Sequence, residues 1–572
     1  MDLCDKGTIH QWKPHELVPR GLLMLCPIND LHNEGSLRFV KVFAKSESIC
    51  TACCLSLLMG GTSIAKPPSG LSTSPTMEPT YNSAESGFPS NRLPCTIFWV
   101  VVGLLLVGLH LALAWLSSSF DYETPILERP ILSLVLIELV AGAVFMTTIW
   151  GIRLSLPGSR ALMTWVFAVG ALLRAIMMTS TPMLETDFYR YMWDGAVLAN
   201  GISPYRYSPE EAAKPSGSVP IALQKLAHES GNVITQVNHP QLRTIYPPVA
   251  QVFFAAAYFL GPWSMLSLRI VLAVFDAATF LILLAVLRGL NLSWLFVVIY
   301  WWNPLVVKEI FNSAHMDVIA VPLVLAALIL TMRARHLNAA GVLALAVGAK
   351  LWPVVLLPLV LSRLWRVPRH LFLAVASFSF LSLMLLLPVY LGGFDWNSGF
   401  MVYGRQWEMN DALFMALTWG VAWLAKLVPA TFSVLQTQVD TAARIFTLLI
   451  LGAWIAWLSR NQPAAPSEFW ERSLLIVAAL FLLSPTQFPW YYLWVLPLLV
   501  IKPRFSLLLL GALLPLYYLR FYYSARDNVG VFDYYIVWLE YIPVWCALIY
   551  EWLVASGARA GKRLGETHAS PM

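Results

Sequence analysis

The sequence has few charged residues, and this scarcity excludes most classes of protein. Of its 572 residues, 12% are charged and 58% are hydrophobic, and the mean hydropathy is +0.66. Soluble domains are roughly 25% charged and 45–50% apolar. The composition therefore does not suit a soluble protein, a disordered chain, a coiled coil or a disulfide-stapled secreted scaffold. It predicts an all-α, polytopic helical membrane protein, whose many aromatic residues suit the two membrane–water interfaces.

Motifs that hold nucleotides are also missing. The sequence has no Walker A motif, no Gly-x-Gly-x-x-Gly after a predicted strand, and no soluble domain to carry one. An activated substrate is therefore expected to arrive dissolved in the membrane, and a polyprenyl-phosphate sugar meets that condition. No nucleic-acid partner is expected.

Residues 1–92 differ from the rest of the chain. They contain five of the seven cysteines and a run rich in Ser, Thr and Pro from 65 to 89. A lone Cys-x-x-Cys (50–53) without a second pair is weak evidence for a metal site. We expect a poorly ordered extension at 1–92, with Met77 as an alternative start, then a membrane domain at 93–556 and a cytoplasmic tail at 557–572.

Charges in the loops predict the sidedness of the membrane domain. The first apolar runs are 96–116, 131–150 and 161–178; the loop after the first is acidic, and the loop after the second carries Arg153 and Arg160. Because positive loops stay in the cytoplasm, both termini are predicted to be cytoplasmic. The long polar loop at 179–243 then lies on the outer side.

Further apolar runs bring the expected total to about 12 to 14 membrane segments. One run is expected to cross as a single helix at 292–307, and another to break around Lys350–Pro353, which leaves Lys350 at depth or on the outer side. Two runs, 246–263 and 412–427, disturb the alternation of sides. We interpret them as re-entrant or surface-lying helices on the outer side.

The first outer loop holds the densest group of reactive side chains. If a helix begins near Thr186, then Asp187, Arg190, Tyr191 and Asp194 occupy i, i+3, i+4 and i+7 and share one face. Such a face would place a carboxylate that can act as a base next to an arginine that can bind an anion. An interfacial helix with ordinary charges is the plainer interpretation. The carboxylates of Glu185, Asp187 and Asp194 leave open whether Mg²⁺ or Mn²⁺ binds.

Other polar residues are predicted on the same membrane face, while the cytoplasmic loops are short and basic. They lie at Arg243–Pro248, in the stretch with Asn312, His315 and Asp317, in the loop with Tyr403, Arg405 and Trp407, and at 484–492. Charges inside the spans are few: Glu138, Arg174, Arg269 and Asp276. Such residues are functional candidates or buried interhelical partners.

The order of these motifs resembles a known family. An acidic pair with a tyrosine (Glu185, Asp187, Tyr189) precedes Gly-Ile-Ser-Pro-Tyr at 201–205, Tyr-Pro-Pro at 246–248, Asp276 in a span, Asn-Pro at 303–304 and Lys-Leu-Trp-Pro at 350–353. This set is similar to the integral-membrane GT-C glycosyltransferases, and most to the first mannosyltransferase of glycosylphosphatidylinositol synthesis and its bacterial relatives. The resemblance covers about 96 to 554.

The resemblance implies a mechanism and a set of site residues. Asp187, or else Glu185, would take the proton of the acceptor hydroxyl as it attacks C1 of the lipid-linked sugar, with inversion. Cationic side chains would hold the leaving phosphate. Glu stands at 185 where Asp is usual, and Asn-Ser-Ala-His-Met-Asp replaces an Arg-Gly-Asn-type motif at 312–317; both fit a bacterial member better. The expected substrate-binding residues are Arg190, Tyr191, Asp194, Arg243, Tyr246, Asn312, His315, Asp317, Lys350 and Arg405.

We therefore predict an enzyme of the inner (plasma) membrane that transfers a hexosyl group, foremost mannosyl, from a polyprenyl-phosphate sugar on the outer, periplasmic face. Its acceptor is a hydroxyl of a lipid, a glycan or a protein. Two alternatives are a transporter or flippase of lipid-linked sugars and an O-antigen-type polymerase or ligase. A transporter needs polar residues along a path through the membrane, whereas here they gather at one face.

Overall fold

The computed structural model describes residues 92–154, 160–214, 219–393, 398–427 and 438–567. The expected N-terminal extension and the alternative start at Met77 lie outside these residues. Within them the chain folds into helices and forms no β-strand, apart from one isolated bridge between Met409 and Thr486. The prediction of an all-α membrane protein is thus confirmed.

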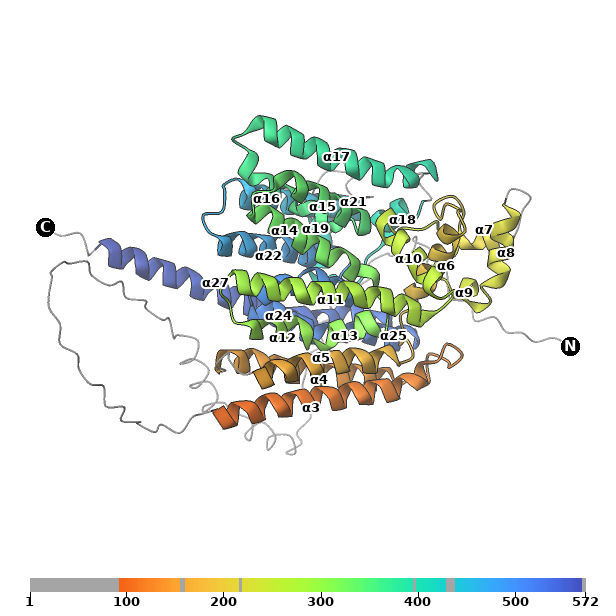
Figure 1. Cartoon of the computed structure of the whole chain (residues 1–572), viewed down its shortest axis with the longest axis horizontal. Helices are drawn as coiled ribbons and strands as arrows, with labels where there is room; N and C mark the ends of the chain where they lie inside the picture. The colour runs from red at the N-terminus through yellow and green to blue at the C-terminus, as the bar shows by residue number, and fades with distance from the viewer. Residues whose placement is uncertain (1–91, 155–159, 215–218, 394–397, 428–437, 568–572) are drawn as a thin grey trace. The chain divides into compact units, whose positions relative to one another are not determined.

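Eight helical segments of the described chain are long and apolar enough to cross a membrane. They are α3 (Arg92–Ser117), α4 (Ile131–Leu154), α5 (Arg160–Met178), α11 (Met265–Gly289), α17 (Pro368–Leu391), α21 (Val439–Ser459), the segment of α24 (Phe505–Leu513) and α25 (Leu519–Ser524), and the segment of α26 (Val529–Val531) and α27 (Val537–Thr567). Figure 1 shows α3, α4 and α5 side by side along one flank.

A ninth candidate span is broken. We expected one continuous crossing at 292–307, but α12 (Val298–Trp301) and α13 (Pro304–Phe311) form a pair bent by 53°. The cause is local: Pro304 supplies no backbone N–H, and the side chain of Asn303 accepts a hydrogen bond from Val306 N at 3.1 Å, which begins a new helix.

Shorter apolar helices account for the remaining expected segments. The break expected around Lys350 is present, because one helix ends at Ala349 and the next turn starts at Trp352. The two runs interpreted as re-entrant or surface-lying form α10 and α19. The short apolar helices are α10 (Pro248–Leu260), α14 (Ala320–Met332), α15 (His336–Ala349), α16 (Leu357–Leu361) and α19 (Ala412–Leu427).

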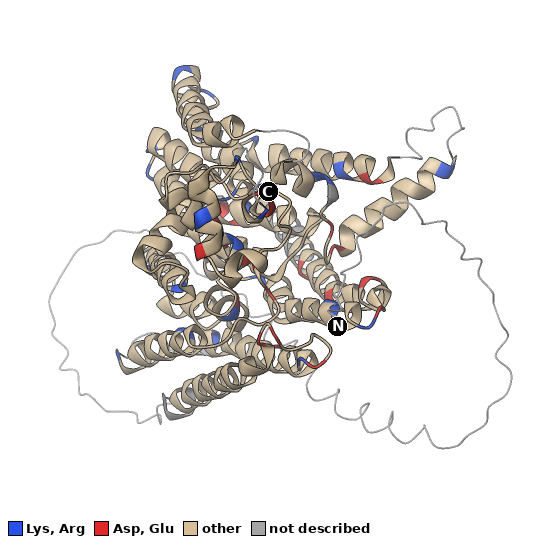
Figure 2. Ribbon diagram, turned by 90° about the vertical axis from the view of Figure 1, so that its right-hand side faces the viewer, with Lys and Arg blue, Asp and Glu red and all other residues tan. Residues whose placement is uncertain are grey.

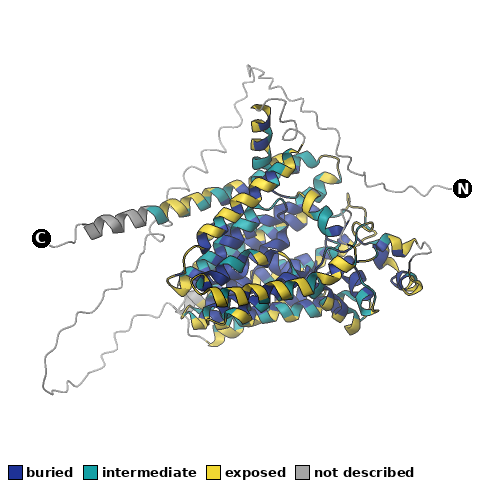
Figure 3. Ribbon diagram, turned by 90° about the horizontal axis from the view of Figure 1, so that it is seen from above, coloured by how far each residue is buried: buried dark blue, intermediate teal, exposed yellow. Residues whose placement is uncertain are grey.

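The core lies where the chain is apolar on all sides. Nearly every residue of 295–328 and 488–501 is buried, and these segments hold α12 to α14 and α23 (Leu496–Ile501). The outer helices instead alternate buried and exposed faces, as Figure 3 shows. Side chains such as Phe372 and Leu383 on α17 are exposed, as expected where lipid rather than water is the solvent.

The first outer loop and its neighbours gather at one end of the bundle. This end holds α6 (Asp187–Ala199), α7 (Pro209–Ala213), α8 (Ile221–Glu229), α9 (Asn232–Thr235) and α18 (Gly399–Gln406), and α27 extends from the other end (Figure 1). Figure 2 looks onto this end and shows charges of both signs among mostly uncharged ribbons. The remaining long helix, α22 (Pro466–Leu483), leads back to the segment 484–491 at the same end.

Candidate active site

A cavity of about 320 Å³ lies at the end of the bundle that carries the first outer loop. Six stretches of the chain supply its walls: the start of α6, the segment before α10, the turn after α15, the region of α18, the segment around Trp490 and the segment around Tyr517. Its polar and aromatic lining residues are Glu185, Thr186, Asp187, Arg190, Asn238, His239, Arg243, Tyr246, Lys350, Tyr403, Trp407, Phe488, Trp490, Tyr491, Tyr517 and Phe521.

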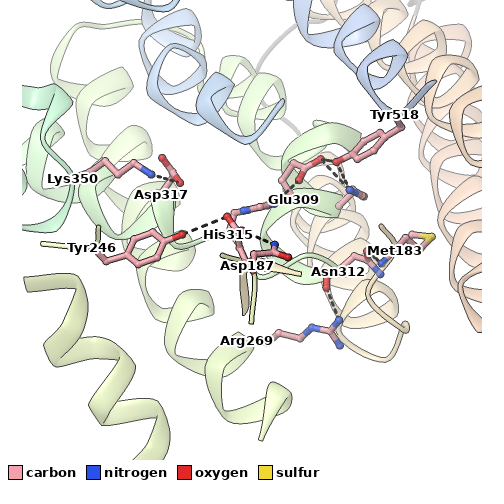
Figure 4. Close-up of polar contacts among 12 residues, drawn as sticks. Met183, Asp187, Tyr246, Arg269, Glu309, Asn312, His315, Asp317, Lys350 and Tyr518 are labelled. Atoms are coloured by element: carbon pink, nitrogen blue, oxygen red, sulfur yellow. Dashed lines mark hydrogen bonds and ion pairs between the residues drawn. The ribbon is translucent and has the colours of Figure 1, made fainter. Parts of the chain in front are cut away.

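Asp187 is the first residue of α6 and faces this cavity while partly exposed. Its carboxylate oxygens accept long hydrogen bonds, one from the Tyr246 hydroxyl at 3.4 Å and one from Asn238 Nδ2 at 3.5 Å (Figure 4). Burial raises the pKa of Asp187, although the ammonium of Lys350 opposes the shift. A weakly held carboxylate with a raised pKa is suited to accept a proton.

Glu185 lines the same cavity but has a different environment. Its side chain is buried, and its Oε1 has no hydrogen-bond partner among the described residues. Burial and the neighbouring carboxylate of Asp187 raise the pKa of Glu185 well above its ordinary range. This carboxyl therefore keeps its proton to a higher pH than a solvent-exposed glutamate does, and its environment differs from that of Asp187.

Arg190, Tyr191 and Asp194 share a face of α6 as predicted, but they do not all reach the cavity. Arg190 lines it, and its guanidinium contacts Asp194 Oδ1 at 3.1 Å and the carbonyl of Leu242 at 2.7 Å. Asp194 also accepts from Gln251 Nε2 at 3.1 Å. This network fastens the segment before α10 onto α6.

Tyr191 lies beneath the cavity rather than in it. Its ring stacks on Phe254 at 4.7 Å and meets the edge of Tyr246 at 4.9 Å, so it supports the tyrosine that contacts Asp187. Among the described residues, no group of three or more His, Cys, Asp or Glu side chains is arranged to hold a metal ion. Glu185, Asp187 and Asp194 thus do not converge on one metal position.

Lys350 brings positive charge to the cavity. The break between α15 and the next turn places it there, with its ammonium 3.2 Å from Asp317 Oδ2 and 4.9 Å from the ring centre of Tyr491. Asp317 is buried and also accepts from Trp494 Nε1 at 2.8 Å, which holds it in place. Only 17% of the Lys350 side chain is exposed, so its charge is partly desolvated.

The two predicted arginines beside Lys350 differ in position. Arg243 lines the cavity, with Nη1 3.3 Å from the carbonyl of Gly392. Arg405 is exposed on α18 and is not among the residues that line the cavity.

Asn312 holds the chain that leads to the acidic pair. Its Oδ1 accepts from Met183 N at 3.0 Å, while its Nδ2 donates to Ser180 Oγ and to the Thr181 carbonyl, both at 2.7 Å. Arg269 donates in turn to the Asn312 carbonyl at 2.6 Å (Figure 4). Asn312 is buried and does not line the cavity, so its geometry is that of a clamp.

His315 supports a different wall of the cavity. Its ring stacks on Trp490 with centres 3.8 Å apart, and its Nε2 lies 3.3 Å from Glu309 Oε2. Glu309 also contacts Lys308 and the hydroxyl of Tyr518 within the core (Figure 4). His315 is fully buried and acts through Trp490, which does line the cavity.

Two of the four charged residues in the spans, Arg174 and Asp276, form a buried pair. Arg174 donates to both carboxylate oxygens of Asp276, at 2.6 and 3.1 Å, and Tyr300 donates to the same carboxylate at 2.8 Å. Of the two roles that the sequence left open for such residues, functional group or buried interhelical partner, this pair has the second.

Several cavity residues were not predicted. Asn238 and His239 come from the loop before α10, and Tyr517 lies far along the chain, in the segment between α24 and α25. Burial lowers the pKa of His239, whose ring meets the edge of Trp407 at 4.7 Å. The only sequence signal was for the aromatic wall, since Trp407 and the stretch 484–492 were expected at this face.

Comparison with known proteins gives one match. Residues 96–366 match the model of a family described as alpha-(1->6)-mannopyranosyltransferase, N-terminal domain. No curated protein and no solved structure matches the chain. The matched residues include the acidic pair, the Asn312 clamp and Lys350, and the match favours an enzyme over a transporter. Residues 96–366 are therefore similar to the N-terminal domain of alpha-(1->6)-mannopyranosyltransferases, and the protein is a membrane-bound glycosyltransferase.

Proposed function

We propose that the protein transfers a mannosyl group from a polyprenyl-phosphate sugar to an acceptor hydroxyl, with inversion, and that Asp187 is the general base. One observation carries the proposal: a partly exposed carboxylate and a partly desolvated ammonium, Asp187 and Lys350, line the same cavity. Glycosyl transfer from a lipid phosphate requires both groups, one for the proton of the nucleophile and one for the charge on the leaving group.

The proposed step is a single displacement at C1 of the donor sugar. The acceptor oxygen forms a bond to C1 while its proton passes to the carboxylate of Asp187. The bond between C1 and the phosphate oxygen breaks, and the phosphate leaves with the electron pair. Lys350 would stabilise the added negative charge, and Arg243 is a further cation that lines the cavity. Glu185, which holds its proton more tightly than an exposed glutamate, would serve as a hydrogen-bonding group beside the base.

We place this cavity on the outer face of the membrane, with both termini in the cytoplasm. The hairpin of α14 and α15 leads away from Asp317 and returns to Lys350. A helix rises about 1.5 Å per residue, so the turn with Arg333 and Arg335 lies roughly 20 Å from the cavity. Because basic turns stay in the cytoplasm, the cavity belongs to the opposite face. The donor phosphate would then reach it from the outer leaflet.

The test is transfer of label from radiolabelled polyprenyl-phosphate mannose in membranes that contain the wild-type protein or the Asp187→Asn variant. Glu229→Gln, an exposed change on α8, is the matched control. We expect the wild type and the control to transfer label and Asp187→Asn to lose transfer while inserting normally. Full activity of Asp187→Asn removes it as the base. No transfer by the wild type from the mannose, glucose or arabinose donors refutes the proposed donor class.

A further inference from the structure

A second hollow lies beside the candidate active site. It encloses about 530 Å³ and is formed by the segment around α7 and by the segment before α10. Arg243 lines both this hollow and the cavity that contains Asp187. We call it the polar groove, and its lining residues are Arg206, Ser208, Glu210, Glu211, Lys214, Gln241 and Arg243.

Hydrogen bonds fix the groove relative to the catalytic cavity. Ser208 and Glu211 form a capping box that begins α7, with contacts of 2.7 and 3.2 Å. The backbone N–H of Glu210 donates to the carbonyl of Pro240 at 2.9 Å, which ties α7 to the other wall. That wall is in turn held to α6 by the contact of Arg190 with Leu242. The groove is thus preformed at a set position from the start of α6.

The chemistry of the lining points to a polyhydroxylated ligand. Every lining side chain is polar, so the groove offers no surface for an acyl or prenyl chain. Its lining contains three cations, two carboxylates, an amide and a hydroxyl. This mixture of charges favours neither a strongly anionic nor a strongly cationic ligand. Sugar hydroxyls both donate and accept, and they match a lining in which donors and acceptors are mixed.

Parts of the lining are already engaged within the protein. Glu210 pairs with Lys214 at 2.7 Å, and Glu211 completes the capping box. Arg206 and Gln241 are the exposed members that stand outside these two arrangements. We therefore expect these two side chains to form the hydrogen bonds that recognise a bound sugar.

We propose that the polar groove binds the sugars of a glycan acceptor that precede the reacting one, so that the terminal hydroxyl passes Arg243 and reaches Asp187. This inference rests on the proposed function and refines it. It predicts that the acceptor contains more than one sugar. It also predicts that contacts in the groove make longer acceptors bind more tightly.

Two synthetic acceptors test the proposal with the full-length protein in detergent: octyl α-mannoside and octyl α-(1→6)-mannotrioside. We expect the wild type to show a lower KM for the trioside. Arg206→Ala and Gln241→Ala should each raise the KM for the trioside about 3- to 10-fold, since one hydrogen bond to a ligand is lost, and leave the monosaccharide KM unchanged. Lys225→Ala, an exposed change on α8 outside the groove, is the matched control and should alter neither value.

A binding measurement separates this inference from the proposed function. Saturation-transfer NMR of the trioside with the purified protein, without any donor, reports acceptor binding independently of transfer. Weaker trioside binding by Arg206→Ala, with binding by Lys225→Ala unchanged, supports the groove even where no transfer is detected. Transfer with equal KM values for both acceptors, or variants that change both acceptors equally, refutes the groove and leaves the proposed function standing. Absence of trioside binding by the wild type also refutes the groove.

Discussion

The two acidic residues at the start of the first outer loop offer a matched pair of perturbations. Asp187→Asn and Glu185→Gln each remove one negative charge with almost no change in shape. Both residues line the cavity, but Asp187 is partly exposed with a raised pKa, whereas Glu185 is buried and its pKa is raised well above its ordinary range. Asp187 has the carboxylate that an acceptor can reach from the cavity, so the two variants should behave differently.

The expected magnitudes follow from these environments. A positioned general base contributes about 10²- to 10⁴-fold, which at about 1.4 kcal/mol per factor of ten is about 3 to 6 kcal/mol of the barrier. Asp187→Asn should lose this factor in kcat. Its stability should change by less than about 1.5 kcal/mol, because well-formed hydrogen bonds to a charged group contribute about 1.5–3 kcal/mol and those to Asp187 are long, 3.4 and 3.5 Å. Glu185→Gln replaces a buried carboxyl that is not the proposed base and should retain kcat within roughly tenfold, the cost of one altered hydrogen bond.

The assay is the pH dependence of label transfer by the purified protein. The base must be ionised, so kcat/KM should fall as the pH is lowered through the raised pKa of Asp187, and this acid limb should vanish from the residual activity of Asp187→Asn. The result that refutes the reasoning is the reverse pattern, in which Glu185→Gln loses the larger factor and Asp187→Asn keeps the acid limb.

Glu185 has a further consequence for stability. A carboxyl whose pKa is raised in the folded state binds its proton more tightly there than in the unfolded chain. Its contribution is therefore complete below the ordinary pKa of about 4.3 and is lost as the pH rises toward the folded value. Glu185→Gln should flatten this decline in thermal denaturation, and an unchanged slope would place the raised pKa in doubt.

Three other predictions concern the supports of the site. Lys350→Met should lower kcat about 10²- to 10³-fold, while Lys350→Arg, which keeps the charge, should recover much of it; equal loss in both would argue against a charge effect. Asn312→Leu should lower kcat and the melting temperature together, because the clamp on the preceding loop loses its hydrogen bonds; unchanged kinetics would contradict the clamp. Asp276→Asn breaks a buried ion pair and should destabilise the protein by about 3–5 kcal/mol through the uncompensated charge of Arg174, which a thermal melt in detergent would detect.

Local sequence features were sufficient to predict the class of protein and the elements that carry the acidic pair. Membrane helices depend on composition within one segment, because lipid requires every backbone group to be satisfied inside the helix. The face of α6 follows from the helical period, and the break before Lys350 follows from Pro353. The bend at Pro304 was missed, because a hydrophobic run was given more weight than its proline.

The roles of individual side chains depended on long-range packing. Asp187 and Asp194 occupy the same face of α6. Hydrogen bonds from Gln251 and Arg190 make Asp194 structural, while Asp187 faces the cavity. From the sequence, Asn312 was likewise predicted to bind substrate. In the structure it donates to Ser180 Oγ and so holds in place the chain that leads to the acidic pair.

The sequence by itself determined that this is a helical membrane protein with an acidic pair near the start of a long polar loop and a cation at a helix break. Hydropathy and helical period are properties of neighbouring residues, and these features need nothing else. The tertiary structure decided which carboxyl is buried and which is partly exposed, which cations line the same cavity and where the polar groove lies. Those outcomes depend on burial and on distances between segments far apart in the chain, since desolvation and charge pairing act through space rather than along the sequence.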